Sequence, residues 1–449
     1  MAVENFAKRL EAAGLALEAI TDRSILHQGV GVEGRHPEQR VRPASVEELA
    51  LVLPAAKASG VSLWIAWNQA GNALVVPPAG GAAPVLLELS RLNRIVEVDA
   101  ASGYALVEPG VSYAQLAAHL KENGLALWLD AGADADASIT GSIWERSFGY
   151  TAYGDRMMMQ CGMEVMQTDG SLVRTGMGAM PGENSWQLFK YGFGPYADGI
   201  FTQSAYAVTT KMGFWVSPQP PAYRPFVWRV DDDDRFVAAM EAVRSLRINM
   251  VVPNTLVAVD ERSERRLTGE GDPGGWNIYG ALYGLEKNVD AVWTMLEGLA
   301  GQLGGITMQP LAPEAERTAL MSGRPAPRYR AFLDGARGRM LRLCFAMPIE
   351  GDSARAFVRG THQIAQGSGC QIVIEQGTAW RSLLAEAFIL FEPGAVDSAL
   401  ELGRRLITHW AQQGIGVVRA SPALQPVALQ QYSDAGFVAL RSRLEEALA

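Results

Sequence analysis

The sequence predicts an α+β protein with two main domains. From residue 43 onward, short apolar runs typical of strands alternate with amphipathic stretches that begin at helix-capping residues. A proline-rich stretch, Pro218-Gln-Pro220-Pro221, interrupts the alternation and marks a domain boundary. Beyond it, strand–helix–strand units recur, as in ferredoxin-like domains. We therefore expect a first domain over residues 1–220 and an α+β domain over residues 221–415.

The first domain begins with an amphipathic helix within residues 3–20, whose apolar face suits packing on the body of the protein. Ser45 and Glu48 form a capping box that begins a second helix, and Ser112 begins a third that ends at Gly124. The expected strands are residues 62–67, 84–89, 94–99, 104–108, 163–167 and 171–175, the last two joined by a hairpin turn at Asp169-Gly170.

The second domain repeats this alternation. One helix begins in the run Asp231–Asp234, where acidic side chains suit the positive end of the helix dipole. Further helices are expected at 286–303, 354–367 and 395–412, between strands at 226–230, 255–260, 277–283, 306–309, 340–348, 371–375, 387–391 and 416–419. The last 35 or so residues read as helical.

Composition narrows the function classes. Of 449 residues, 48% are hydrophobic and 19% are charged, which is typical of a globular enzyme-sized protein. The net charge of −9 disfavours a nucleic-acid partner, because such binding needs clustered basic residues. The three cysteines are far apart and the five histidines are scattered, so we expect no metal site and a reducing, cytoplasmic location. No signal peptide or membrane span is expected.

Several short sequence motifs of the first domain are distinctive. They are residues 107–111, Glu145-Arg146, Tyr150–Asp155, Arg174–Pro181, Tyr191–Pro195, Asp198–Gln203 and Thr210–Gly213. In register, they resemble the vanillyl-alcohol oxidase and 4-cresol dehydrogenase flavoproteins over residues 41–220, and the likeness is looser beyond. The resemblance implies an FAD-binding domain of the p-cresol methylhydroxylase type, an α+β cap over the isoalloxazine ring, and a C-terminal segment, 416–449, that returns to the first domain. It also implies para-substituted phenols as substrates, which react as phenolates through a para-quinone methide.

The positions at which this family holds FAD depart from its pattern. In register, residues 68–74 lack the family's arginine and the glycines that let backbone N–H groups approach a pyrophosphate. The alternative is a one-residue slip that brings Gly71-Asn72 into place. Asp134 and Asp136 stand in the second phosphate-facing loop, where unpaired carboxylates would repel the phosphates. The positions of covalent flavin attachment hold Ile372, Leu384 and Ala385. We therefore expect no cofactor, with noncovalent FAD as the alternative.

A flavin-sized void would be costly, at roughly 24 cal/mol per Å³, so larger side chains are expected to fill it. The candidates are Trp144, Phe148 and Leu74. We expect Asp134 and Asp136 to turn to solvent, or to Arg146 and Arg156.

Two candidate site residues match the family's pocket. Arg419 matches the arginine that holds the phenolate, although Leu74 and Val418 replace the accompanying tyrosines. A guanidinium at this place can bind a phenolate or a carboxylate; the alternative is a surface salt bridge. Tyr150 matches a tyrosine beside the pocket and can exchange a proton with a ligand, or it packs beneath the cap.

Three further candidates follow from position. Asp134 is one residue from Ala133, which aligns with the family's aspartate near the flavin, and it can act as an acid or base if burial raises its pKa. The alternative is a solvated loop acid. Glu375 and Arg381 lie on and just after a strand facing the cap pocket, where they pair with each other or bind an acidic substrate.

These expectations combine into a cofactor-independent lyase acting on para-hydroxyphenyl, lignin-derived aromatic acids. The para-hydroxyl group expels a benzylic leaving group, and a carboxylate then leaves as carbon dioxide from the quinone methide. One alternative is an FAD-dependent oxidoreductase of para-substituted phenols. Another is a catalytically inactive subunit that partners an intact flavoprotein paralogue. For the lyase and for the oxidoreductase we expect a homodimer that acts on a small phenolic substrate. We expect no nucleic-acid partner and no membrane partner.

Overall fold

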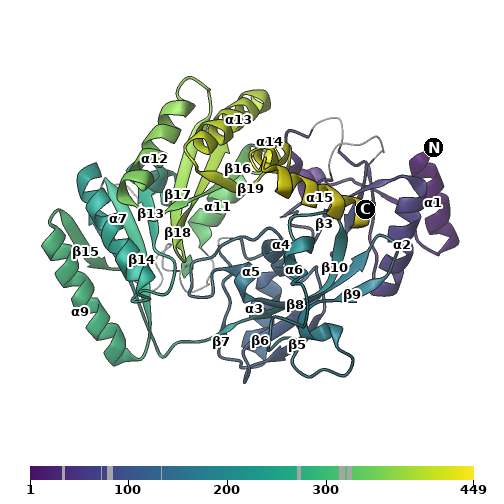
Figure 1. The fold of residues 1–449 in the computed structure, drawn as a ribbon, viewed down its shortest axis with the longest axis horizontal. Coiled ribbons are helices and arrows are strands. Elements are labelled where there is room, and N and C mark those ends of the chain that lie inside the picture. Colours follow the sequence, from purple (N-terminus) through teal and green to yellow (C-terminus); the bar gives the residue numbers. More distant parts are fainter. Residues whose placement is uncertain are drawn as a thin grey trace.

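The computed structural model describes residues 1–32, 36–71, 73–77, 84–132, 134–269, 275–312, 319–320 and 326–448. Two lobes lie side by side (Figure 1). The first lobe contains strands β1 to β11, and the second contains β12 to β19. The α+β class predicted from the sequence is confirmed.

The first lobe holds two main sheets. One has the order β1-β2-β4-β3, with β2 and β3 both parallel to β4. Its strands are β1 (Glu18–Ala19), β2 (Gln39–Val41), β3 (Ser62–Ala66) and β4 (Pro84–Glu88). The other is antiparallel, in the order β5-β6-β10-β8-β9. Its strands are β5 (Ile95–Asp99), β6 (Tyr104–Val107), β8 (Gln160–Gln167), β9 (Leu172–Arg174) and β10 (Ala207–Trp215), while β7 (Leu127–Trp128) pairs with β11 (Ser217–Pro218).

Short helices and loops complete this lobe. They are α1 (Ala2–Ala12), η1 (Arg23–Gly29), α2 (Val46–Ser59), α3 (Tyr113–Glu122), α4 (Ile139–Trp144), α5 (Arg156–Met159), η2 (Gly176–Ala179) and α6 (Asp198–Phe201). The predicted caps are confirmed: the N–H of Glu48 donates to Ser45 Oγ (3.2 Å), and the N–H of Gln115 donates to Ser112 Oγ (3.1 Å). Each bond satisfies a helix-end donor that has no partner within the helix.

The second lobe is built on one sheet of eight strands, here called the large sheet, with the order β15-β12-β14-β13-β17-β18-β16-β19. The strands are β12 (Ala222–Val230), β13 (Val257–Asp260), β14 (Trp276–Gly284), β15 (Ile306–Pro310), β16 (Met340–Pro348), β17 (Gln371–Ala379), β18 (Ser382–Leu390) and β19 (Gly416–Ala420). The helices are α7 (Asp233–Ile248), α8 (Glu261–Thr268), α9 (Glu286–Leu303), α11 (Pro327–Gly335), α12 (Gly351–Ala365) and α13 (Val396–Gln412). Then come η3 (Pro422–Leu424), α14 (Gln425–Gln430) and α15 (Ala435–Leu448).

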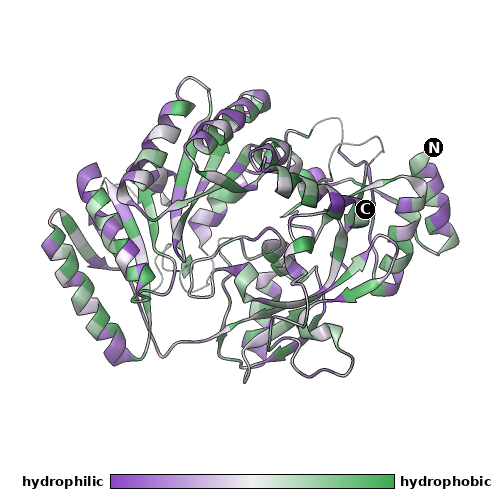
Figure 2. Cartoon of the chain, viewed as in Figure 1, coloured by the Kyte–Doolittle hydropathy of each residue, from purple (hydrophilic) through white to green (hydrophobic). Residues whose placement is uncertain are grey.

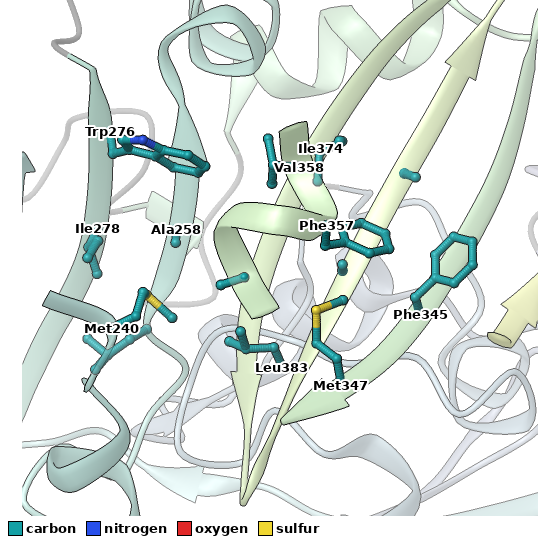
Figure 3. Packing of buried hydrophobic residues seen from close by; sticks show 14 of the residues in the cluster. Met240, Ala258, Trp276, Ile278, Phe345, Met347, Phe357, Val358, Ile374 and Leu383 are labelled. Carbon is teal, nitrogen blue, oxygen red and sulfur yellow. The ribbon is translucent and has the colours of Figure 1, made fainter. Parts of the chain in front are cut away.

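The two faces of the large sheet are covered differently. One face packs against α7, α9, α12 and α13 and forms the largest apolar cluster of the protein; Phe357, Met347 and Trp276 belong to it (Figure 3). Residues on the opposite face, such as Val257 and Phe388, pack with Leu267 of α8 and Tyr329 of α11. Hydrophobic colour concentrates in the strands, whereas the helices alternate between hydrophobic and hydrophilic segments (Figure 2).

Strand β19 pairs with β16 at the edge of the large sheet. The expected domain boundary at residue 416 therefore falls within this sheet. The division of the chain into three parts stays a prediction. Among the described residues, no helix is long and apolar enough to cross a bilayer.

Candidate functional site

A cavity of about 190 Å³ lies where the two lobes meet. Residues of the first lobe on both sides of α4 and within it, from Gly132 to Tyr150, line one side, and strands β16 to β19 of the large sheet line the other. Residues of η1, His27 among them, close a third side. The cavity thus draws on segments from both halves of the chain.

Four residues form a cross-strand row on the cavity wall. Strand register places Glu375 of β17 opposite Glu386 of β18, Glu386 opposite Cys344 of β16, and Cys344 opposite Arg419 of β19. All four line the cavity. We call this set the cross-strand row. Since neighbouring strands are about 4.8 Å apart, its two carboxylates lie side by side, an arrangement that needs compensating partners.

Tyr150 supplies the partner at one end. Its hydroxyl donates to Glu375 Oε1 (2.6 Å), and the Glu375 residue is only 6% exposed. A short bond from a phenol to a buried carboxylate is charge-assisted and orients both groups. The two residues are 225 positions apart in the sequence.

Asp130 fixes the backbone that carries Tyr150. Its Oδ2 accepts hydrogen bonds from the N–H groups of Tyr150 (2.9 Å) and Thr151 (2.7 Å). Gly149 is required by this contact, because a Cβ there would lie 1.9 Å from Asp130 Oδ1. Thr255 of the second lobe donates to the Gly149 carbonyl (3.0 Å). The loop that carries Tyr150 is therefore held from both lobes.

Arg419 lies at the other end of the row. Arg419 lines the cavity. Its Nη2 also forms an ion pair with Glu386 Oε1. Arg342 of β16 approaches the other oxygen of the same carboxylate, with Nη2 3.8 Å from Oε2. Burial raises the pKa of the Cys344 thiol, which Arg419 and Arg342 oppose. Two guanidinium groups thus share one carboxylate.

Asp134 also lines the cavity, but it is paired. Arg330 of α11 donates to Asp134 (2.7 Å) and to Asp136 (2.8 Å). Asp136 is exposed to solvent, as expected. For Asp134, the expected solvent or Arg146 and Arg156 are replaced by Arg330, because α11 of the second lobe packs over this segment. Ala133 lies outside the described residues.

Arg381 is not part of the cavity wall. It is exposed in the turn between β17 and β18, whereas Glu375 is six residues back inside β17. Glu375 accepts a hydrogen bond from the hydroxyl of Tyr150 at 2.6 Å.

Sequence reasoning missed His27. Its Nδ1 lies 3.0 Å from the carbonyl oxygen of Ser24. A carbonyl oxygen only accepts hydrogen bonds, so Nδ1 carries the hydrogen. In the neutral ring, Nε2 is then the acceptor. Burial lowers the pKa of His27; Arg337 and Arg342 act in the same direction, and Ser24 and Asp134 oppose it. No motif surrounds this histidine, so no sequence signal marked it.

Two of the three expected cavity-filling side chains lie elsewhere. Trp144 packs on Trp67 (ring centroids 5.9 Å apart) inside an apolar cluster of the first lobe. Leu74 packs with Ile25 and neighbouring residues in another. Of the three, only Phe148 lines the cavity. The prediction that Trp144 and Leu74 fill the volume is wrong, because the first lobe buries both in its own core.

Among the described residues, no group of three His, Cys, Asp or Glu side chains is arranged to hold a metal ion.

Comparison with known proteins places these features in context. Residues 37–176 match the FAD binding domain family. The chain is 30% identical to the 4-cresol dehydrogenase [hydroxylating] flavoprotein subunit of Pseudomonas putida, covering 92% of this chain and 85% of that protein. It is 33% identical to the 1'-carboxy-chondrochloren decarboxylase of Chondromyces crocatus over 46% of this chain and 39% of that protein. The crystal structure of p-cresol methylhydroxylase with substrate bound superposes with a TM-score of 0.89 at 27% identity, covering 100% of this chain and 94% of that one.

The expectation that no cofactor is bound is therefore wrong. The matched region is an FAD binding domain, and the relative aligned over 92% of the chain is a flavoprotein subunit. The inference treated Asp134 and Asp136 as unpaired, whereas both form ion pairs with Arg330 across the lobe boundary; Arg330 also pairs with Asp334. This pairing weakens their repulsion of a phosphate.

The cavity floor fits the ring of such a cofactor. Ala131, Gly132, Ala137 and Ser142 line it, and their small side chains leave space for a planar group. Gly132 has a φ of +61°, and a Cβ there would lie 3.0 Å from Arg156 Nη2. These four residues are the ones that would hold the ring against the first lobe.

Proposed function

Because the chain belongs to the vanillyl-alcohol oxidase/4-cresol dehydrogenase flavoprotein family, we propose that it is an FAD-dependent oxidoreductase of para-substituted phenols. The observation that carries the proposal is the cross-strand row, which presents a guanidinium at one end of the cavity and a phenol–carboxylate pair at the other. FAD, when bound, supplies the acceptor for a hydride from the benzylic carbon.

The Arg419 end serves the phenol oxygen. Arg419 is 13% exposed and lines the cavity, so its charge is little screened by water there. A phenolate has the charge and the acceptor lone pairs that a guanidinium fork binds. Holding the substrate as its phenolate raises the electron density at the para position, where oxidation takes place.

The Tyr150–Glu375 pair serves the opposite end. Three strand spacings, about 14 Å, separate the backbones of Glu375 and Arg419, and both side chains line the cavity. A para-substituted ring bound at Arg419 would direct its benzylic carbon toward Glu375. There the carboxylate can take a proton from a water that adds to the benzylic carbon, with Tyr150 holding the carboxylate in position.

The proposal is tested by anaerobic mixing of the FAD-loaded protein with 4-ethylphenol and, separately, with 4-ethylanisole. We expect the phenol to bleach the flavin absorbance and the methyl ether to leave it unchanged, because only the phenol can form the phenolate. Equal bleaching by both compounds, or none by any para-alkylphenol, would contradict the proposal. The second result would favour the inactive-subunit alternative.

A second candidate function is oxidative decarboxylation, favoured by the 33% identity to a decarboxylase and by the extra guanidinium of Arg342 on the cavity wall. After hydride transfer, a carboxylate on the carbon next to the benzylic position leaves as carbon dioxide. Its bonding electrons form the new C=C bond and return the quinone methide to a phenolate. This route keeps the decarboxylation expected from the sequence and assigns the two electrons to FAD. Release of one carbon dioxide for each flavin reduced would distinguish it from simple dehydrogenation.

A further inference from the structure

The guanidinium of Arg342 is only weakly engaged within the protein. Arg419 and Arg342 each approach one oxygen of the Glu386 carboxylate, which is 20% exposed as a side chain. The distance from Arg342 Nη2 to Glu386 Oε2 is 3.8 Å, which is longer than a hydrogen bond. Glu375, opposite Glu386 in the row, accepts the Tyr150 hydroxyl, so the donors of Arg342 stay open to a ligand.

Arg342 is also placed to contact a ligand in the cavity. Its register partner on β18 is Phe388, and its guanidinium carbon lies 5.4 Å from the centre of that ring. The ring supports the guanidinium from one side, and the side chain still lines the cavity at 37% exposure. An arginine held in this way keeps hydrogen-bond donors available for an incoming group.

Other charged groups of the cavity wall carry both signs. Arg337, just after α11, also lines the cavity and forms an ion pair with Asp334 (3.0 Å). Asp134 is bound by Arg330, and Glu145 lines the cavity as well. Arg342 is therefore distinguished by its open donors and not by an overall positive charge.

We propose that Arg342, beside Arg419, forms a carboxylate subsite, and that the natural ligands of this cavity are para-hydroxyphenyl compounds bearing a carboxylate. The subsite rests on the proposed function, because it adds a second anchor to the cavity in which the phenol binds. A carboxylate has the geometry that a guanidinium binds in a bidentate manner.

Isothermal titration calorimetry tests the subsite on the FAD-loaded protein, with the flavin held reduced by dithionite so that no ligand is turned over. The probes are 3-(4-hydroxyphenyl)propanoate, its methyl ester and 3-phenylpropanoate. We expect the acid to bind about tenfold more tightly than the ester, as one charge-assisted hydrogen bond allows, and this preference to fall with added NaCl.

Amino-acid substitutions distinguish the contribution of Arg342 to binding from that of other residues in the cavity wall. We expect Arg342→Gln to remove the preference for the acid while changing the Kd of the ester less than twofold. Glu386→Gln, which removes the competing carboxylate, should increase the preference. Arg339→Gln is the matched control, because Arg339 is in the same segment but pairs with Glu392 (3.9 Å) outside the cavity wall.

The outcomes distinguish the two proposals. Equal affinity for acid and ester, or an unchanged preference in Arg342→Gln, overturns the subsite and leaves phenol oxidation standing. Equal affinity for the acid and 3-phenylpropanoate overturns phenol recognition and leaves the subsite standing. Absence of binding by all three probes below 1 mM overturns both.

Discussion

At the scale of single residues, the site depends on contacts between positions that are far apart in the chain. The sequence indicated Tyr150 and Glu375 separately, but nothing in it joins two residues 225 positions apart. The same holds for Asp134, whose partner Arg330 is 196 positions away. Composition and spacing name candidate side chains, while tertiary contacts decide which of them are paired.

The bond between Tyr150 and Glu375 leads to the first prediction. Tyr150→Phe leaves the buried carboxylate without its 2.6 Å donor, so we expect kcat for a para-alkylphenol to fall about 100-fold, with KM changed little. Unfolding should become about 1–2 kcal/mol more favourable. Rapid anaerobic flavin reduction and urea titration measure the two effects. Tyr153→Phe, in the same loop but outside the cavity wall, is the control and should match the wild type.

His27 leads to a pH prediction. Burial, together with Arg337 and Arg342, lowers the pKa of His27 from its ordinary value of 6.5. Below pH 6.5 the unfolded chain therefore binds the proton more readily than the folded protein, and stability falls as the pH falls; above pH 6.5 the group contributes nothing. We expect the Tm of the wild type to drop more steeply between pH 7.5 and 5.5 than that of His27→Gln. His409→Gln, an exposed histidine on α13, is the control, and identical slopes in wild type and His27→Gln would refute the assignment.

At the scale of elements, local signals predicted well wherever the element is defined locally. The capping pairs and the apolar periodicity predicted helices α2, α3 and α9. The expected limits of α9 and β16 agree with those found. Helices α8 and α11 were missed. The sequence of α8, Glu-Arg-Ser-Glu-Arg-Arg-Leu-Thr, has almost no apolar stripe, and this helix is held by packing on the large sheet.

The missed helix α11 also contacts the first lobe beside the cavity, through Arg330. We expect Arg330→Ala to speed hydrogen exchange in residues 134–137, because it removes the ion pairs to Asp134 and Asp136. The loss of stability should be about 1 kcal/mol, since these pairs are partly exposed. Arg355→Ala breaks two ion pairs, to Asp234 and Asp352, on the other face of the sheet, and should leave exchange in this loop unchanged. Equal exchange in the two variants would show that α11 does not hold the loop.

At the scale of the whole molecule, the fold was predictable because many short sequence motifs of the first lobe match the flavoprotein family in the same order. Motifs that keep their order along the chain indicate a shared architecture. The cofactor was mispredicted because a sequence does not show how a charged side chain is paired in the folded protein. Losses at single positions, such as Asp134, were compensated by residues of the other lobe. The homodimer and the cytoplasmic location remain predictions.

The last prediction concerns how FAD is held. Of the positions at which relatives were expected to attach it covalently, Ile372 and Ala385 are buried in the apolar core of the second lobe. Leu384 lines the cavity, but its hydrocarbon side chain cannot form a bond to the flavin. In the loop after β3, the N–H groups of Ala70 and Gly71 already donate to Asn68 (3.1 and 3.3 Å). The pyrophosphate therefore finds fewer donors there.

We accordingly expect one FAD for each chain, bound without a covalent bond and released by acid precipitation into the supernatant. Dialysis against concentrated KBr should remove it, and added FAD should restore the flavin absorbance. Because a ligand bound to both lobes stabilises only the folded chain, FAD at about 100 times its Kd should add about 2.7 kcal/mol to the free energy of unfolding, which differential scanning calorimetry detects as a raised Tm. Flavin retained in the acid pellet would contradict the noncovalent attachment, and a Tm that does not respond to FAD would contradict binding between the lobes.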